Sequence, residues 1–357
     1  MLLEKTKIYG VDGVGQSSPS LTRTDAAVGL TYTIGASEII SDFSHCYPWS
    51  EMQEVVDELG NVFIRIPKFY TKVTKNGNGT YKYQISGCRY DGFSTLFIDG
   101  KGNELDYVLV GKYEASGSSA KASSKSGQTV LVNINIVDMR TACKANGEGY
   151  QQYDFLIDAI IKQLFMIEFA TTNSQGIMAG WTSYENSAAI ITGHTDSVKT
   201  ASGSWNANHE SGCDTCNSDG LHACKYRGIE NLWGNVYKWC DGINFVDEKV
   251  YICLDPTKYA SENTAMPYIY MGDRDMDGGY MSKVTPFEKF PLLGYCTEAY
   301  GDESSYFCDY CYSYGSVLCV GGYWGGGADA GLWYWNGGLD ASIATSGIGG
   351  RLCYKPL

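Results

Sequence analysis

Cysteine and histidine side chains gather in one stretch of the chain, HESGCDTCNSDGLHAC at residues 209–224. The thiols of Cys213 and Cys216 have a C-x2-C spacing, and with His222 and Cys224 they offer the soft ligand set that Zn²⁺ prefers. The second half of this spacing is unlike that of a common zinc module, which favours a chance cluster or a disulfide. Zinc at these four residues stays an alternative, and we predict neither a metal nor a cofactor.

Other reactive constellations are less specific. Cys308 and Cys311 repeat the C-x2-C spacing without a nearby histidine, and core packing is the better interpretation. Asp273 and Asp275 in GDRDMDGG could surround a cation, but the glutamate that closes an EF-hand loop is missing. The sequence contains neither a Walker loop nor a GxSxG elbow. We therefore predict no catalytic residue.

A different chemistry is suggested by residues 321–350, where aromatic residues alternate with runs of small ones. This segment contains no Lys, Glu, Gln, Met, Arg or His, although roughly a quarter of residues in an average protein are charged. It is either a tightly turned, glycine-rich part of a β core, or a binding surface whose side chains vary on a fixed frame.

The composition limits the classes of partner. The chain has 357 residues and a net charge of −13, and its 27 Lys and Arg are scattered, so a footprint for nucleic acid is missing. The 28 Tyr and 8 Trp are typical of contact surfaces as well as of β cores. An odd count of 13 Cys predicts reduced core thiols. No apolar stretch reaches about 18 residues, so no membrane insertion is expected, and the start, MLLEKTKIYG, turns charged too early for a secretory signal.

Helical periodicity is clearest at residues 156–169, where apolar residues form a wide stripe and predict a largely buried helix. A second helix is predicted from a cap at Asp138 to a point before Gly147. Between Ser50 and Gly60 a short capped helix and a hairpin are both compatible with the sequence.

Strand patterns dominate the rest of the chain. Residues 62–66 alternate and stop at Pro67, residues 71–86 form a hairpin around Asn-Gly-Asn-Gly, and residues 105–110 form another strand. Residues 115–128 are of low complexity and predict a mobile loop. Two helices among many scattered strands indicate an α+β domain. We assign residues 46–357 to this domain and residues 1–45 to an attachment or oligomerisation segment, or to an outer layer of the domain.

The stretch GIENLWGNVYKW at 228–239 resembles the N-(L/M)-x-G-N-V-x-E-W signature of the C-type lectin fold of the formylglycine-generating-enzyme type. Weaker resemblances follow in the family's order: IPKFY (66–70), GKYEAS (111–116), the helix at 156–169, GGYW (321–324) and IGGRL (348–352). The resemblance covers roughly residues 60–357. It implies two helices with short twisted β-sheets and long loops.

The catalytic members of that family use a cysteine pair shortly after the GGSW element. Residues 325–330 contain no cysteine here, and Cys319 and Cys353 lie in strand-like positions that we interpret as core. The family can also bind Ca²⁺ through an acidic residue of the motif, but this chain has Lys238 there. We therefore predict that the protein is not an enzyme.

The C-terminal segment resembles the variable region of proteins targeted by diversity-generating retroelements. That mechanism rewrites adenines, and AAC codons so rewritten cannot encode Lys, Glu, Gln, Met or Trp. The resemblance implies a variable region at about 312–350, with scaffold residues Trp324, Trp333, Tyr334, Trp335 and Arg351. The variable, ligand-binding residues, called here the variable-face residues, would be Tyr323, Gly325, Gly326, Ala328, Asp329, Gly338, Leu339, Ile343, Ala344, Thr345 and Gly347.

The N-terminal stretch from TRTDAAVGL to SGCRYDGF resembles tail-fibre or receptor-binding proteins of phages. We therefore expect a non-enzymatic receptor-binding protein, or adhesin, in a phage tail. It would be made in the bacterial cytoplasm, would act on a host-cell protein or glycan, and could be a trimer through its N-terminal segment. The alternatives are an enzyme or metal-dependent protein of the same fold, and a structural virion protein without a ligand.

Overall fold

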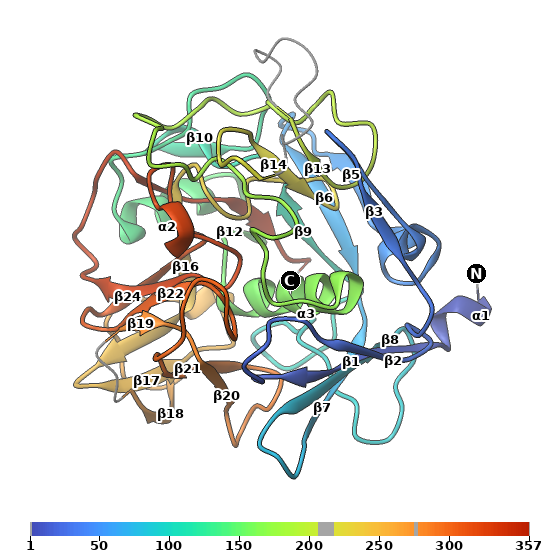
Figure 1. The fold of residues 1–357 in the computed structure, drawn as a ribbon. Helices are drawn as coiled ribbons and strands as arrows, with labels where there is room; N and C mark the ends of the chain where they lie inside the picture. Colours follow the sequence, from blue (N-terminus) through green and yellow to red (C-terminus); the bar gives the residue numbers. More distant parts are fainter. Residues whose placement is uncertain (1, 206–217, 275–277, 357) are drawn as a thin grey trace.

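The computed structural model of the chain describes residues 2–205, 218–274 and 278–356. Small sheets surround a central helix (Figure 1). The helices of the described ranges are α1 (Leu2–Lys5), α2 (Ile136–Lys144) and α3 (Phe155–Phe169). None of them combines the length and the apolar character needed to cross a bilayer. The mixture of sheets with few helices agrees with the α+β expectation.

Helix α3 is the centre of the core. Asp154 caps its first turn by accepting a hydrogen bond from the amide of Ile157, and Ala170 ends it in the left-handed conformation. Every residue of α3 except Ala159 is buried. A helix that is buried on all sides must be enclosed by other elements, and the prediction for residues 156–169 is confirmed.

Helix α2 covers a second, smaller apolar cluster. Its cap is Asn135, whose side chain accepts from the amide of Asp138, so the helix begins earlier than the predicted cap at Asp138. Met139, Ala142 and Cys143 face a cluster that also contains Trp239 of the large sheet. This cluster lies next to the C-terminal segment.

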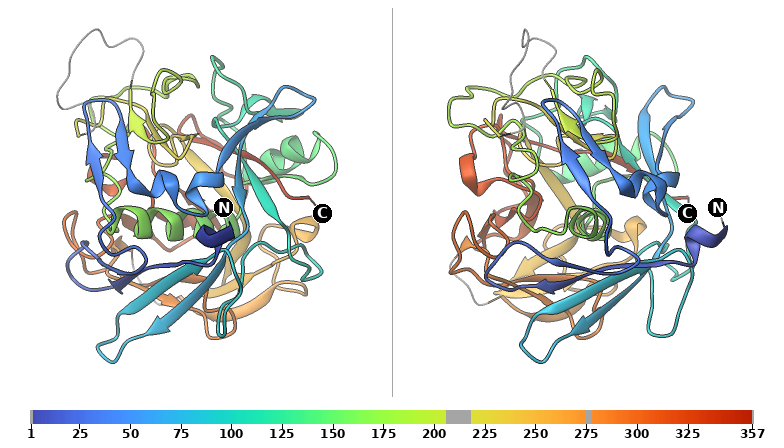
Figure 2. Two further views of the ribbon diagram at one scale, coloured as in Figure 1. Left: turned by 90° about the vertical axis from the view of Figure 1, so that its right-hand side faces the viewer. Right: turned by 45° about the vertical axis from the view of Figure 1, so that its right-hand side comes forward.

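The first sheet is formed largely by the start of the chain. Its strand order is β2-β1-β8-β7, and Figure 2 shows it on one side of α3. Tyr9 and Val11 are buried in the main core, so residues 1–45 pack into the body of the molecule; whether they also serve attachment stays a prediction. The bounds are β1 (Ile8–Val14), β2 (Thr22–Asp25), β7 (Tyr70–Lys75) and β8 (Tyr81–Ser86), and a separate pair is formed by β3 (Tyr32–Ile34) and β4 (Ile39–Ser41).

A five-stranded sheet pairs the last strand of the chain with earlier strands, in the order β12-β26-β9-β6-β5. Between Ser50 and Gly60 the hairpin is right and the helix is wrong: after a single 3-10 turn, η2 (Trp49–Glu51), the chain extends and Val56 pairs with Val62. Asp57 makes the turn by accepting from the amides of Leu59 and Asn61. The bounds are β5 (Gln53–Val56), β6 (Val62–Pro67), β9 (Tyr107–Gly111), β12 (Tyr150–Gln152) and β26 (Leu352–Tyr354).

The largest sheet carries the C-terminal segment, in the order β18-β17-β16-β23-β24-β22-β19, with β25 beside β16. Two of its pairings are parallel, β16 with β25 and β22 with β24, so residues distant in sequence lie side by side. The bounds are β16 (Tyr237–Val246), β17 (Lys249–Ile252), β18 (Ile269–Asp273), β19 (Gly279–Tyr280), β22 (Tyr310–Tyr312), β23 (Val317–Val320), β24 (Trp335–Leu339) and β25 (Ile348–Gly349).

Short elements complete the fold. Residues 115–128, expected to be a loop, form a hairpin whose Ala122 is buried, because small side chains fit closely beneath α2. The remaining strands are β10 (Ser116–Ser118), β11 (Lys121–Ser123), β13 (Gly203–Ser204), β14 (Cys224–Tyr226), β15 (Ile229–Glu230), β20 (Lys283–Pro286) and β21 (Gly294–Glu298). Further 3-10 turns are η1 (Asp42–His45), η3 (Pro256–Lys258) and η4 (Gly327–Asp329).

Candidate functional site

The aromatic residues Trp333, Tyr334 and Trp335 form a buried frame beneath the C-terminal segment. They are 3%, 1% and 3% exposed. The Trp333 amide donates to the buried Asp309 carboxylate at 2.7 Å, and the Trp335 ring stacks on Tyr295 with a centroid distance of 4.9 Å. Paired polar groups and stacked rings fix the backbone on either side of them.

Arg351 ties this frame to the opening strands. It is fully buried, and its guanidinium donates to the carbonyls of Gly111, Lys112, Glu230 and Asn231. Arg351 of the IGGRL motif therefore bonds to the main chain of two other motifs, GKYEAS (111–116) and GIENLWGNVYKW (228–239). This placement agrees with a scaffold role for Arg351.

The GNVYKW motif surrounds a buried carboxylate, that of Glu114. Asn231 and Asn235, both in the left-handed conformation, donate to it through their side-chain amides. The Lys238 ammonium lies 3.5 Å from Glu114 Oε1 and donates to the Gly234 carbonyl at 2.8 Å. Burial lowers the pKa of Lys238 to about 8. An ammonium therefore occupies the place beside the motif where the family resemblance would put a calcium ligand.

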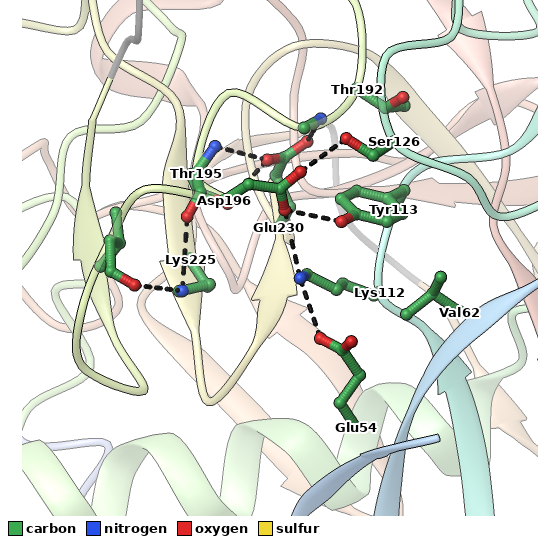
Figure 3. A network of polar contacts seen from close by, with 12 residues as sticks. Glu54, Val62, Lys112, Tyr113, Ser126, Thr192, Thr195, Asp196, Lys225 and Glu230 are labelled. Atoms are coloured by element: carbon green, nitrogen blue, oxygen red, sulfur yellow. Dashed lines mark hydrogen bonds and ion pairs between the residues drawn. The ribbon is translucent and has the colours of Figure 1, made fainter. Parts of the chain in front are cut away.

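A second buried carboxylate, Glu230, anchors the loop beside this motif (Figure 3). It accepts from the Gly193 amide and from the amide and hydroxyl of Thr195, each within 2.8 Å. Burial raises its pKa. Asp196, next in the chain, accepts from the Tyr113 hydroxyl and pairs with Lys112. The loop at residues 193–196 is thus fixed by the side chains of Glu230, Tyr113 and Lys112.

The backbone of residues 323–330 is held by groups outside the segment. The Trp324 amide donates to the Asn235 carbonyl at 2.9 Å, and the Gly327 amide donates to the Thr182 carbonyl at 2.7 Å. Asn186 Nδ2 donates to the Trp324 carbonyl at 3.0 Å. Since these bonds use the main chain of the segment, they persist when its side chains change.

Most variable-face residues lie at the surface. Ala344 and Thr345 are exposed, and the half-buried ones are Tyr323, Gly325, Gly326, Ala328, Asp329, Gly338, Leu339 and Ile343. Gly347 is buried, and a Cβ there would lie 3.2 Å from Cδ2 of Tyr323, so its expected exposure is wrong. Leu339 and Ile343 are expected to bind a ligand, and the structure shows that both also pack against the cluster beneath α2. Their apolar character therefore has a packing cause.

Trp324 is another correction. It was expected in the buried frame, but it is half-buried and lines an apolar groove of about 330 Å³. The Asn235 side chain holds one wall of this groove by exchanging hydrogen bonds with the main chain of Ile190. Trp324 is therefore partly accessible at the surface.

The glycines of the segment are of two kinds. At Gly325, Gly326 and Gly338 the nearest atoms to an added Cβ are 3.5, 3.2 and 3.1 Å away, and φ lies outside the left-handed region. At Gly331, with φ of +156°, an added Cβ would lie 2.2 Å from Oδ1 of Asp309; at Gly327, with φ of +54°, it would lie 2.1 Å from Cζ of Tyr184. A side chain at Gly325 would make only ordinary contacts, and one at Gly326 or Gly338 would need its neighbours to shift by a few tenths of an ångström. At Gly327 and Gly331 the backbone conformation itself strains any larger residue.

Tyrosine side chains gather around η4. Tyr184 is 74% exposed and stands against Gly327. The other rings follow in close contact, with centroid distances of 5.4 Å for Tyr280–Tyr310 and 4.5 Å for Tyr310–Tyr312. Further contacts run from Tyr312 through Tyr334 and Tyr237 to Tyr323. We call Tyr184, Tyr280, Tyr310, Tyr312 and Tyr323 the tyrosine cluster.

Sequence analysis did not identify Tyr184, Tyr280 or Tyr310 as site residues. Tyr280 and Tyr310 face each other across the β19–β22 pair, and Tyr184 comes from a loop. The high tyrosine content was a signal, but nothing local connects these positions to residues 321–350.

The remaining sequence candidates are placed as follows. Cys213 and Cys216 lie outside the described residues, as does Asp275, and within the described ranges no group of three or more His, Cys, Asp or Glu could hold a metal ion. His222 is buried and bonds to Asp219 through Nδ1, while burial raises the pKa of the Cys224 thiol to about 12. As expected for core thiols, four others are buried: Cys308, Cys311, Cys319 and Cys353.

No family model and no curated protein matches the chain. Among solved structures it is similar to the U1, P3c and I1 variants of a Major Tropism Determinant, at 9%, 10% and 9% sequence identity. Each match covers 98% of this chain and 72% of the other, with TM-scores of 0.33, 0.32 and 0.33. At this level of similarity the matches add no weight to the fold or the function, which rest on the residues above.

Proposed function

We propose that the chain is a non-enzymatic receptor-binding protein that displays a retroelement-diversified surface on a C-type lectin scaffold of the formylglycine-generating-enzyme type. It acts in a phage tail, where it binds a protein or glycan of the host-cell surface. Residues 1–45 contribute to attachment or to a homotrimer. The variable-face residues carry specificity, and the frame beneath them stays constant.

The observation that carries the proposal is the division within one segment. Trp333, Trp335 and Arg351 are buried, and Arg351 bonds to main-chain carbonyls inside the molecule. At Gly325, by contrast, an added Cβ would meet its nearest atom at an ordinary contact distance of 3.5 Å. Main-chain hydrogen bonds to other loops hold the backbone regardless of those side chains. A rigid frame lets each new side chain add contact without a large ordering cost.

The shape of the surface bears on affinity. Glycine and alanine occupy many of its positions, which leaves a shallow site with few contacts per copy. Tyr323 is the main anchor, because tyrosine offers large amphipathic contact at low entropy cost. Multiple copies on a virion would raise avidity by about 10²–10⁴.

The genetic test is to sequence codons 312–350 in many sibling genomes. Variation confined to the variable-face residues, with a near-copy of the segment beside a reverse-transcriptase gene, supports diversification. Uniform codons without such a copy would leave a fixed-specificity adhesin or a structural virion protein as the better account.

The binding test uses purified chain and host cells. Replacing Tyr323, Asp329 and Thr345 by alanine together should reduce binding at least about tenfold if they include an anchor. A matched control changes Thr74 and Lys75 to alanine; both are exposed on the β7–β8 hairpin of the first sheet. Unaltered binding of the triple variant would rule out this surface as the receptor site.

A further inference from the structure

Part of the tyrosine cluster lies beside a carboxylate of the variable face, that of Asp329. Asp329 closes η4, the turn that begins at Gly327, where Tyr184 stands. Burial and then the Asp329 carboxylate raise the pKa of Tyr280, and the Tyr280 ring contacts Tyr310, which in turn contacts Tyr312. The carboxylate is half-buried and the rings around it are open to solvent, with Tyr184 at 74% and Tyr312 at 36% exposed.

The electrostatic character of this surface is one-sided. After burial, the group that most raises the pKa of Tyr184, Tyr280 and Tyr312 is the carboxylate of Asp329. Glu303 also raises the pKa of Tyr184 and Tyr280. The titratable groups that act most strongly on these phenols are thus carboxylates and other tyrosines. Phosphate or carboxylate groups of a ligand would be repelled here.

We propose that Asp329 and the tyrosine cluster bind a basic side chain of a protein ligand, either a lysine ammonium or an arginine guanidinium. Aromatic faces attract cations through their quadrupole, and a half-buried carboxylate supplies the counter-charge. A neutral sugar could also stack on tyrosine, but it would gain nothing from the net negative charge. This inference rests on the proposed function, because it names the ligand chemistry at the same surface.

The composition of the site separates a constant part from a changeable part. Tyr184 and Tyr280 lie outside residues 312–350, whereas Asp329 is a variable-face residue. The constant rings would accept many ligands, and the residue at position 329 would decide whether a cation is preferred. Siblings with a neutral residue there should lose that preference.

The test uses two probes of the same shape, Nα-acetyl-arginine amide and the uncharged Nα-acetyl-citrulline amide. Each is titrated into the full chain with ¹³C-labelled tyrosine rings, followed by NMR. The arginine probe should shift Tyr184, Tyr280 and Tyr312 saturably, and it should bind at least about threefold more tightly than the citrulline probe. Methyl glycosides form a third arm for a neutral sugar.

Variants locate the effect. D329N should weaken the arginine probe to the level of the citrulline probe, whereas D340N, which neutralises an exposed carboxylate of the same segment, should leave it unchanged. Y184F keeps the ring and should bind as the parent does; Y184L removes the ring and should bind more weakly. Equal binding of the two probes, no arginine shifts at all, or full arginine binding by D329N would each overturn the proposal. Saturable glycoside binding without a preference for charge would mean that the tyrosine cluster binds a neutral glycan instead.

The outcome is separable from that of the proposed function. The probes are measured without host cells, so probe binding by a chain that does not attach to cells would contradict only the receptor role. Attachment that depends on Tyr323 but not on Asp329 would contradict only the cation site.

Discussion

Residues 321–351 contain two regions that differ in how they are built. The frame, centred on Trp333, Trp335 and Arg351, is buried and uses its polar groups inside the molecule. The variable-face residues, such as Tyr323 and Asp329, lie at least partly at the surface. The main chain between them is held by hydrogen bonds to other loops. A small residue in this segment can therefore be replaceable at one position, such as Gly325, and required by the backbone at another, such as Gly331.

The strongest contrast should come from two tryptophans of this segment. W333A removes a buried ring that contacts Phe165 and Phe307, and should lower the free energy of unfolding by about 3–5 kcal/mol. W324A removes a half-buried ring and should cost about 1 kcal/mol. Urea denaturation of both variants measures the gap. Equal losses would mean that Trp324 belongs to the frame after all.

The next largest effect is expected at Arg351. R351M leaves buried carbonyls of Gly111, Lys112, Glu230 and Asn231 without their donor, and should cost about 2–4 kcal/mol. The matched control is R89M, because Arg89 is a surface arginine whose side chain is 60% exposed; it should change stability by less than about 1 kcal/mol. A stable R351M protein would show that the frame does not depend on this residue.

Glycine substitutions should separate the two regions more finely. G331A forces a Cβ against Asp309 in the left-handed region and should cost about 1–3 kcal/mol. G325A meets no close atom and should change stability by less than about 0.5 kcal/mol. Thermal and urea unfolding measure both. A large loss at G325A would mean that this glycine serves the turn rather than the surface.

The smallest effect concerns the pH dependence of the frame. The folded state lowers the pKa of Lys238 from 10.5 to about 8, so above pH 8 the unfolded chain holds a proton that the folded chain has lost. Stability from this group therefore rises between about pH 8 and 9.5, by on the order of 1 kcal/mol. The double variant E114Q/K238M, which removes both charges, should lack this rise. Parallel pH profiles of the two proteins would contradict the burial of a titrating Lys238.

The sequence predicted those elements whose signals are local. The buried helix at 156–169 follows from its apolar stripe and its cap, and the hairpin at 71–86 follows from its Asn-Gly turn. The hairpin near Gly60 could not be separated from a helix, because the capping pattern at Ser50 suits both. The decision is made by Asp57, which bonds to the turn, and by pairing with β6.

The candidate site was only partly readable from the sequence. The frame residues Trp333 and Trp335 were expected from the resemblance of the segment to a variable region. The partial burial of Trp324, Leu339 and Ile343 depends on packing against distant elements. The parallel pairing of β22 with β24 brings Tyr312 next to the segment, and no local pattern encodes it. Tertiary contact, not propensity, decides which side of each residue faces water.

The central claim, that one segment combines a fixed frame with a free surface, is tested most directly by a complete substitution library of residues 321–351. The displayed library is sorted for resistance to a protease, which reports folding, and read by sequencing. Broad tolerance should appear at Tyr323, Gly325, Gly326, Ala328, Asp329 and Gly338, with strong depletion at Gly331, Trp333, Trp335 and Arg351. Uniform tolerance, or depletion as strong at the first group as at the second, would contradict the account.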